Sequence, residues 1–201
     1  REYPQYGPLV ALTRRCGTRL GPVLLGRQDP LQLLFEGGSF AATEALYKDL
    51  PSARAFNQLV AEAVALAAGP RKPRAPRIIE VGAGTGATTA AVLPLLPDGT
   101  EYRFTDVSPL FLARARERLG GSLEFALFDA ESDPAAQGLP VGEADVVVAA
   151  NVLHATADLR RTLTNLRALL APGGSLVLLE GTRPERWVDL TFGLTEGWWE
   201  F

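Results

Sequence analysis

Arg77-Ile78-Ile79-Glu80-Val81-Gly82-Ala83-Gly84-Thr85-Gly86-Ala87-Thr88-Thr89 is the stretch that decides the fold. The apolar run from Ile78 to Val81 predicts a buried parallel strand. Three glycines follow at alternate positions, where a chain can adopt positive φ or approach a ligand closely. A helix is expected next, over residues 85–96. A strand, a glycine turn and a helix in this order direct helix N–H groups at an anion or polar cofactor. The stretch therefore predicts a nucleotide-type cofactor site.

Strands and helices alternate through the rest of the chain. Strands are expected over residues 77–81, 101–106, 123–128, 144–150 and 175–180, and helices over 85–96, 109–120 and 158–170. Ser108 is expected to cap the second of these helices. The strands have the composition of buried strands, and alternation with helices is typical of parallel sheets with right-handed crossovers. The predicted fold class is α/β, with a doubly wound, mostly parallel sheet.

Residues 1–70 have helical spacing and no strand pattern. Apolar residues recur at intervals of three and four, with breaks expected at Gly17 and at Gly21-Pro22. Further helices are expected after Asp29-Pro30, from Ser39 to Tyr47, and over residues 51–68. The basic, proline-rich segment 69–77 is interpreted as a solvated connector. The predicted domains are a small all-helical lid subdomain over residues 1–70 and a cofactor-binding core over residues 71–201.

Composition excludes several classes of function. The chain has 201 residues, 47% of them hydrophobic, and a net charge of −3, which argues against binding to nucleic acid or an anionic membrane surface. No apolar stretch could span a bilayer, and no signal peptide is recognised. The single cysteine, Cys16, is interpreted as a packing residue and favours the cytoplasm. The absence of methionine suggests a piece excised from a longer polypeptide, and no metal site is expected.

Two aspartates are candidate ligands of a cofactor. Asp106 ends the second strand, about 20 residues after the glycine turn, where an acid accepts hydrogen bonds from ribose hydroxyls. Asp129 ends the third strand, where an adenine amino group would need an acceptor. Val107 and Ala130, which follow these acids, are included in the predicted site. The alternative interpretations are a helix cap for Asp106 and a loop-turn residue for Asp129.

The glycine pattern alone fits two cofactors. With Ala87 in place of the third glycine it satisfies a dinucleotide motif, and it equally fits sites that bind S-adenosylmethionine. Glu80, just before the turn, would repel a pyrophosphate but can help to anchor a cationic sulfonium cofactor through its surroundings. The predicted cofactor residues in the turn are Glu80, Gly82, Ala83, Gly84 and Gly86.

Several segments together resemble class I S-adenosylmethionine-dependent methyltransferases. They are Glu80 to Gly86, Phe104-Thr105-Asp106-Val107-Ser108, Ala149 to Thr156 including Asn151 and His154, Leu178-Leu179-Glu180, and the segment from Trp187 to Trp199. More narrowly, they are similar to the C-methyltransferase domains of modular polyketide synthases. The resemblance covers most of the chain. Because that family completes its sheet with a further hairpin, the C-terminal strands are expected to be missing from this sequence.

The resemblance implies a reaction and its residues. The substrates of the resembling family are β-ketoacyl thioesters on the phosphopantetheine arm of an acyl carrier protein. The partners that the resemblance implies are that carrier protein and the neighbouring synthase domains. His154, the only histidine, would remove the α-proton, and Glu180 would orient the imidazole. Tyr47 and Asn151 would bind the enolate oxygen or position the substrate, and Asn151 is also assigned to the cofactor site. Trp198 and Trp199 are interpreted as core residues in preference to acyl-pocket residues.

Two alternatives to an active C-methyltransferase stay open at this stage. The first is an inactive methyltransferase-like domain kept as a structural element of a synthase. The second is a nicotinamide-dependent oxidoreductase that uses Gly82, Gly84 and Ala87. The second ranks last, because no second nucleotide-binding half and no Tyr-x-x-x-Lys pair follow.

Overall fold

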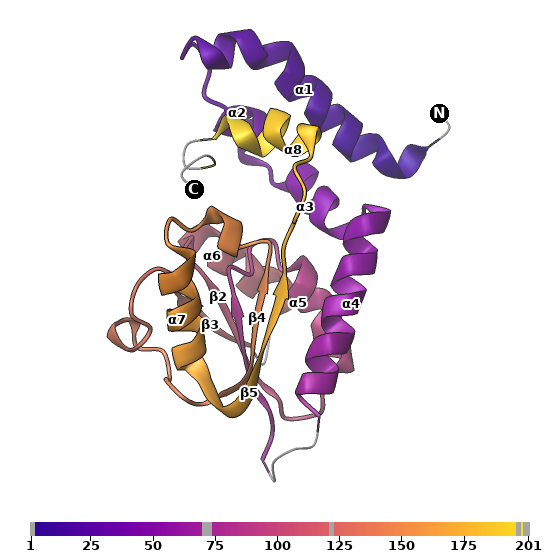
Figure 1. The fold of residues 1–201 in the computed structure, drawn as a ribbon. Coiled ribbons are helices and arrows are strands. Elements are labelled where there is room, and N and C mark those ends of the chain that lie inside the picture. The colour runs from indigo at the N-terminus through magenta and orange to yellow at the C-terminus, as the bar shows by residue number, and fades with distance from the viewer. Residues whose placement is uncertain (1–2, 70–73, 121–122, 196–197, 199–201) are drawn as a thin grey trace. The chain divides into compact units, whose positions relative to one another are not determined.

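Five parallel strands form one sheet in the computed structural model of the chain, which describes residues 3–69, 74–120, 123–195 and 198. The strands are β1 (Arg77–Val81), β2 (Glu101–Asp106), β3 (Leu123–Leu127), β4 (Ala144–Ala150) and β5 (Leu170–Leu179). Their order is β3-β2-β1-β4-β5 (Figure 1). The order reverses between β1 and β4, which confirms the predicted doubly wound α/β fold and places a ligand crevice at the carboxyl ends of these two strands.

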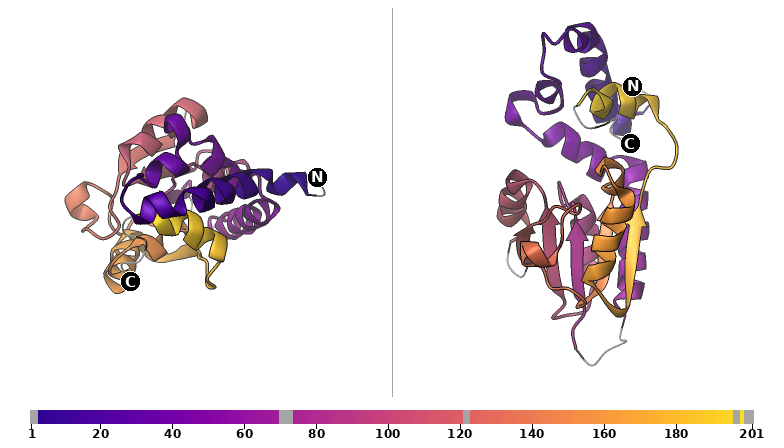
Figure 2. Two further views of the ribbon diagram at one scale, coloured as in Figure 1. Left: turned by 90° about the horizontal axis from the view of Figure 1, so that it is seen from above. Right: turned by 60° about the vertical axis from the view of Figure 1, so that its left-hand side comes forward.

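Alternate residues of the central strands face two layers of helices. Ile79, Val81 and Val147 pack in one core with Leu166 of α7 (Leu159–Leu169). Ile78, Val146 and Val148 pack on the opposite face with residues of α4 (Pro51–Ala67) and α5 (Ala87–Val92). Helix α6 (Pro109–Leu119) covers Phe104 of β2. Figure 2 shows these parallel strands and their helices from a second side. Burial on both faces explains why the central strand β4 is a nearly continuous apolar run.

Two element boundaries differ from the sequence prediction. The helix expected over residues 85–96 is shorter, because Gly86 has left-handed backbone angles and α5 begins only after it. A 3-10 turn, Leu93–Leu95, replaces its last part. Strand β5 begins at Leu170, directly after α7, and not at Ser175. A Cβ on Gly174 would lie 2.8 Å from the carbonyl oxygen of Ala144, so the irregular start of β5 passes close to β4 only because glycine has no side chain.

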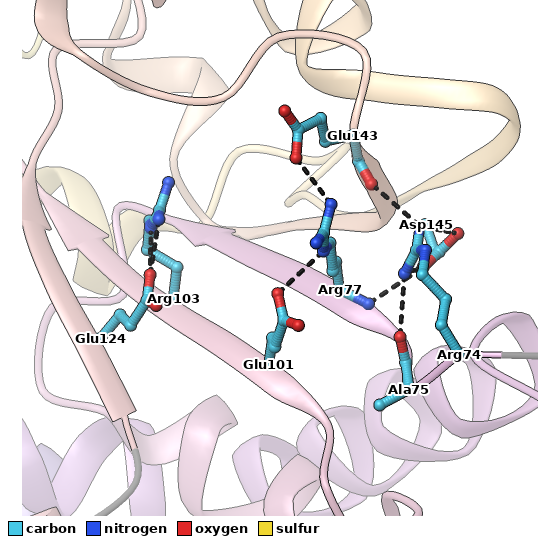
Figure 3. A network of polar contacts seen from close by, with 8 residues as sticks. All are labelled: Arg74, Ala75, Arg77, Glu101, Arg103, Glu124, Glu143 and Asp145. Atoms are coloured by element: carbon cyan, nitrogen blue, oxygen red, sulfur yellow. Dashed lines mark hydrogen bonds and ion pairs between the residues drawn. The ribbon is translucent and has the colours of Figure 1, made fainter.

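The amino ends of the strands are joined by ion pairs (Figure 3). Asp145 Oδ2 accepts a hydrogen bond from Arg74 Nη1 at 2.7 Å and another from the backbone N–H of Arg77 at 2.9 Å. The Arg77 side chain donates to Glu101 at 2.8 Å and to Glu143 at 2.6 Å. The basic end of the predicted connector is therefore paired with acids of β2, β4 and the residue before β4. Residues 70–73 of that connector lie outside the described residues.

The chain divides into two compact units. The sheet unit is Phe56–Glu180, and the helical unit is Arg1–Ala55 together with the segment from Gly181 onward. Most of α4 belongs to the sheet unit because Val60, Ala61 and Val64 pack against strands. The bounds of these units thus differ from the domain division at residue 70, which stays a prediction.

The helical unit contains α1 (Gly7–Leu24), α2 (Leu31–Leu34), α3 (Ala41–Lys48) and α8 (Arg186–Thr191), the last of which was not predicted. Its core includes Leu12, Leu34, Leu46 and the fully buried Cys16, which is a packing residue as interpreted. Trp198 stacks on Phe192 in this unit, whereas Trp199 lies outside the described residues. Among the described residues no helix is long and apolar enough to cross a membrane.

The predicted breaks at Gly17 and Gly21-Pro22 were wrong, because α1 continues through both. Pro22 lies in the last turn of the helix, where its missing N–H removes only one hydrogen bond. The helix ends at Leu24, and Gly26, just after its C-cap residue Leu25, has φ of 66°. The N–H of Arg27 donates to the carbonyl of Pro22 and that of Gly26 to the carbonyl of Val23, which is a Schellman termination.

Candidate active site at the carboxyl edge of the sheet

The predicted cofactor turn leaves β1 as a chain of left-handed glycines. Gly82, Gly84 and Gly86 have φ of 60°, 52° and 69°. The N–H of Ala83 donates to the carbonyl of Thr105 at 2.9 Å, which fixes the turn to β2. A Cβ on Gly82 would lie 2.6 Å from a methyl of Val152, whereas a Cβ on Gly84 would meet only one atom, at 3.8 Å. Gly84 therefore leaves room beside the backbone, and Gly82 lets the turn pack against the residues after β4.

Asp106 is positioned by the same turn. Its Oδ2 accepts the N–H of Gly84 and its Oδ1 the N–H of Ser108, both at 2.8 Å. Burial raises the pKa of Asp106, and the backbone hydrogen bonds from Ser108, Gly84 and Val107 oppose that rise. Each oxygen keeps a lone pair for a ribose hydroxyl. Ser108 is the N-cap residue of α6, as predicted, with Pro109 at the first helical position, but its side chain makes no capping hydrogen bond. Val107 is 69% exposed and offers an apolar surface beside the acid.

Asp129 organises the loop after β3. Its Oδ1 accepts the N–H of Glu131 at 2.9 Å and its Oδ2 the hydroxyl of Ser132 at 2.8 Å. The Gln137 amide bridges the N–H and the carbonyl of Asp129. These contacts fit the loop-turn interpretation, so adenine binding by Asp129 and the adjacent Ala130 stays a prediction.

Glu80 lies beneath the turn with its side chain fully buried. Its Oε2 accepts the hydroxyls of Thr89 at 2.6 Å and Tyr102 at 2.7 Å. Burial raises the pKa of Glu80 to about 7, although both hydrogen bonds lower it. The carboxyl group thus ties β1 to α5 and β2. Contact between Glu80 and a cofactor stays a prediction.

His154 and Glu180 meet at the ends of β4 and β5, as the resemblance to C-methyltransferase domains implied. His154 Nδ1 lies 2.8 Å from Glu180 Oε2. Glu180 Oε1 accepts the N–H of Val152 at 2.9 Å and that of Leu153 at 2.6 Å. Burial tends to raise the pKa of Glu180, but the hydrogen bonds from His154, Leu153 and Val152 outweigh it, and the pKa is lowered. The ionised carboxylate therefore holds both the imidazole and the 3-10 turn Leu153–Ala155 that carries it.

Asn151 begins the turn that leads to His154. Its φ is 56°, a left-handed conformation that asparagine tolerates better than most residues. Its N–H donates to the carbonyl of Leu179 at 2.7 Å, which keeps the end of β4 joined to β5. Tyr47 lies on α3 of the helical unit, with its ring centroid 6.2 Å from that of Phe192. The substrate roles assigned to Asn151 and Tyr47 stay predictions.

Sequence analysis missed three residues that support this site. Val152 bridges the cofactor turn and the dyad, since its side chain covers Gly82 and its N–H binds Glu180. Tyr102 and Thr89 hold Glu80. Val152 lies in the loop after β4, Tyr102 in β2 and Thr89 in α5, and none is a residue type that by itself indicates a functional role. The parallel register of β1 and β2 could have suggested Tyr102. It pairs with Ile78, which lies two residues before Glu80 on β1 and therefore on the same face of the sheet.

Comparison with known proteins identifies the family of the domain that carries this site. Residues 79–176 match the family model described as a methyltransferase domain. The chain carries a methyltransferase domain. Polyketide synthase ThaG of Burkholderia thailandensis is 45% identical over 190 residues, which are 90% of this chain and 3% of that protein. Other matching relatives are also named as polyketide or diketide synthases.

Solved structures of methyltransferases also match this chain. The CurJ carbon methyltransferase has a TM-score of 0.94 and 45% identity, and the match covers 100% of this chain and 54% of that one. The trans-methyltransferase CalH, in complex with SAH, has a TM-score of 0.77 and 34% identity, covering 97% of this chain and 54% of that one. The chain thus spans about half the length of these structures. The domain has the class I, Rossmann-like fold, whose methyl donor is S-adenosylmethionine.

The observed residues suit that donor. In the glycine turn, Gly84 leaves space in which a cofactor can approach the backbone closely. Asp106 keeps lone pairs that can accept hydrogen bonds from ribose hydroxyls. The exposed Val107 offers an apolar surface beside Asp106, and its role in binding a cofactor stays a prediction. The methyltransferase family identifies the cofactor as S-adenosylmethionine.

Proposed function

We propose that this domain transfers a methyl group from S-adenosylmethionine to the α-carbon of a β-ketoacyl thioester carried by an acyl carrier protein. The observation that carries the proposal is the His154–Glu180 pair at the switch point, next to the glycine turn. The likeness to carbon methyltransferases supports carbon as the acceptor atom. Neighbouring synthase domains as partners, and a cytoplasmic location, belong to the same proposal.

The bound cofactor supplies an electrophilic methyl group on a sulfonium. His154 acts on the other reactant. Because Nδ1 faces the Glu180 carboxylate, Nε2 is the imidazole nitrogen that accepts the proton from the α-carbon. That carbon lies between two carbonyl groups, so the electron pair left behind is delocalised as an enolate. With the cofactor bound, the enolate carbon would form the new C–C bond to the methyl group as the methyl–sulfur bond breaks, and the sulfur would leave as a neutral thioether that keeps the electron pair of that bond.

Glu180 has two tasks in this mechanism. Its Oε2 fixes the imidazole tautomer and stabilises the imidazolium formed by proton transfer. Its Oε1 anchors the N–H groups of Val152 and Leu153, so the turn cannot rotate the ring away. Proximity of the base and the methyl donor then depends on Val152, which packs on Gly82.

The direct test is mass spectrometry of a carrier protein loaded with a β-ketoacyl chain and incubated with S-adenosylmethionine. We expect a gain of one methyl group with the wild-type domain. His154→Ala should lower turnover by roughly 10²- to 10⁴-fold, which is the range for a general base. Cofactor affinity, measured by calorimetry, should not change, because His154 is not assigned to the cofactor site.

Glu180→Gln separates the two roles of the carboxylate. Glutamine can still accept backbone N–H groups, but it cannot stabilise an imidazolium, so kcat should fall with little change in KM, and the pH–rate profile should shift. Retained turnover in His154→Ala would overturn the base assignment. Cofactor binding by the wild-type domain without any turnover would favour an inactive structural domain instead.

A further inference from the structure

Gln137 holds the backbone of the loop that follows β3. Its Oε1 accepts the N–H of Asp129 at 2.8 Å, and its Nε2 donates to the carbonyl of Asp129 at 2.9 Å. Nε2 also lies 3.2 Å from the carbonyl oxygen of Ser132 and 3.3 Å from that of Asp133. A single side chain, at the end of the 3-10 turn Ala135–Gln137, thus pairs with both backbone groups of Asp129, as a residue of a neighbouring strand would.

This loop has one backbone donor for which no acceptor is found among the described residues. Over residues 128–132, every N–H has a partner except that of Ala130. Ala130 is 7% exposed, and its carbonyl accepts a hydrogen bond from Asn165 Nδ2 of α7 at 2.9 Å. Because buried backbone N–H groups are nearly always paired, the arrangement calls for an acceptor supplied by a bound molecule.

Gln137 also sets the direction of the Ala130 N–H. The carbonyl of Asp129 and the N–H of Ala130 belong to one peptide group, which is planar and trans, so they point in opposite directions. Since Gln137 holds the carbonyl, the N–H is directed away from Gln137. Each carboxylate oxygen of Asp129 accepts one hydrogen bond, from Glu131 or Ser132, and keeps a second lone pair. One amide therefore fixes a donor and an acceptor on adjacent residues.

This donor and acceptor are complementary to the edge of an adenine ring. Adenine presents an acceptor, N1, next to a donor, its amino group, whereas hypoxanthine presents an N1–H donor next to a carbonyl acceptor. A backbone N–H beside a carboxylate therefore pairs with adenine and opposes hypoxanthine. The loop also lies next to the acid predicted to bind ribose, because the N–H of Phe128 donates to the carbonyl of Asp106 at 3.0 Å.

We propose that Gln137 is a positioning residue that sets the preference of the site for an adenine cofactor. It acts through Asp129 and Ala130 and does not itself contact the ring. The proposal rests on the adenine role predicted for these two residues within the proposed function. It does not depend on methyl transfer, because only binding of the cofactor is involved.

The test is calorimetric titration of the whole chain with S-adenosylhomocysteine and with S-inosylhomocysteine, in which hypoxanthine replaces adenine. The wild type should bind the adenine compound at least about tenfold more tightly. Gln137→Met keeps the length of the side chain but removes the amide. It should weaken binding of the adenine compound about tenfold and change that of the other by less than about twofold.

Gln58→Met is the matched control. It makes the same change at an exposed glutamine of α4 in the same unit, where the amide donates to Glu62 at 2.9 Å. Its preference for the adenine compound should equal that of the wild type. Gln137→Glu is a second variant. Its carboxylate can still accept the N–H of Asp129 but cannot donate to the carbonyl, so the preference should fall as in Gln137→Met.

Three results would overturn the proposal. The first is an equal loss of affinity for both compounds in Gln137→Met, which would show a general loosening of the site. The second is a wild-type preference retained in Gln137→Met or Gln137→Glu. The third is the absence of a preference in the wild type, which would also remove the adenine role of Asp129 and Ala130. Failure of methyl transfer would be seen separately, by mass spectrometry of the carrier protein.

Discussion

Gly82→Ala tests the contact between the cofactor turn and the turn that carries His154. The new Cβ would lie 2.6 and 2.8 Å from the two methyl groups of Val152. These distances are too short for the atoms to stay where they are. Gly82 also has φ of 60°, where a residue with a side chain is disfavoured by about 1–2 kcal/mol. Overpacking adds about 1–3 kcal/mol. The expected loss in free energy of unfolding is therefore about 2–5 kcal/mol.

Gly84→Ala is the matched control for this substitution. Gly84 has φ of 52°, but its Cβ would meet only the carbonyl oxygen of Gly82, at 3.8 Å. Gly84→Ala should therefore lower the free energy of unfolding by about 1–2 kcal/mol, from the positive φ alone and without steric overlap. Urea denaturation of both variants measures the difference. The difference between them is the contribution of the Val152 contact.

A double-mutant cycle gives the decisive result. Val152→Ala alone should destabilise the domain through lost packing, but in the Gly82→Ala background it removes the overlap. We expect a favourable coupling energy of about 1–3 kcal/mol between the two substitutions. Equal losses for Gly82→Ala and Gly84→Ala, or strictly additive effects in the cycle, would refute the reasoning.

Two further predictions concern stability. Folding raises the pKa of Glu80 from 4.5 to about 7, so the unfolded chain loses this proton at a lower pH than the folded chain does. The free energy of unfolding should therefore fall by about 3 kcal/mol as the pH rises from 4.5 to 7. Glu80→Gln should lack this part of the pH dependence in urea denaturation, and an unchanged profile would contradict the assignment. Asp145→Ala should cost about 2–3 kcal/mol, because it removes the carboxylate that pairs with Arg74 and leaves the N–H of Arg77 without its acceptor (Figure 3). Glu124→Ala, which breaks a more exposed pair, should cost less than about 1 kcal/mol, and equal losses by thermal or urea denaturation would show that burial of Asp145 is unimportant.

The patterns that could be interpreted from sequence were local ones. Apolar runs predicted β1 and β4 with their observed bounds, because a parallel strand buried on both faces is largely apolar. The position of Asp106 after β2 followed from chain spacing alone. The break expected in α1 failed because proline near a helix end can be tolerated, and helical spacing does not show where the helix ends.

What the sequence by itself determined is therefore the α/β alternation and the left-handed glycine turn, whereas the pairing of His154 with Glu180 was implied by the resemblance to a family. Only the tertiary structure decided how Glu180 divides its oxygens between His154 and two backbone N–H groups, and that Val152 packs on Gly82. It also decided that Glu80 is buried between two hydroxyls. The physical reason is that apolar periodicity fixes which face of an element is buried. The hydrogen-bond partners of a buried polar group depend on where distant parts of the chain are brought by packing.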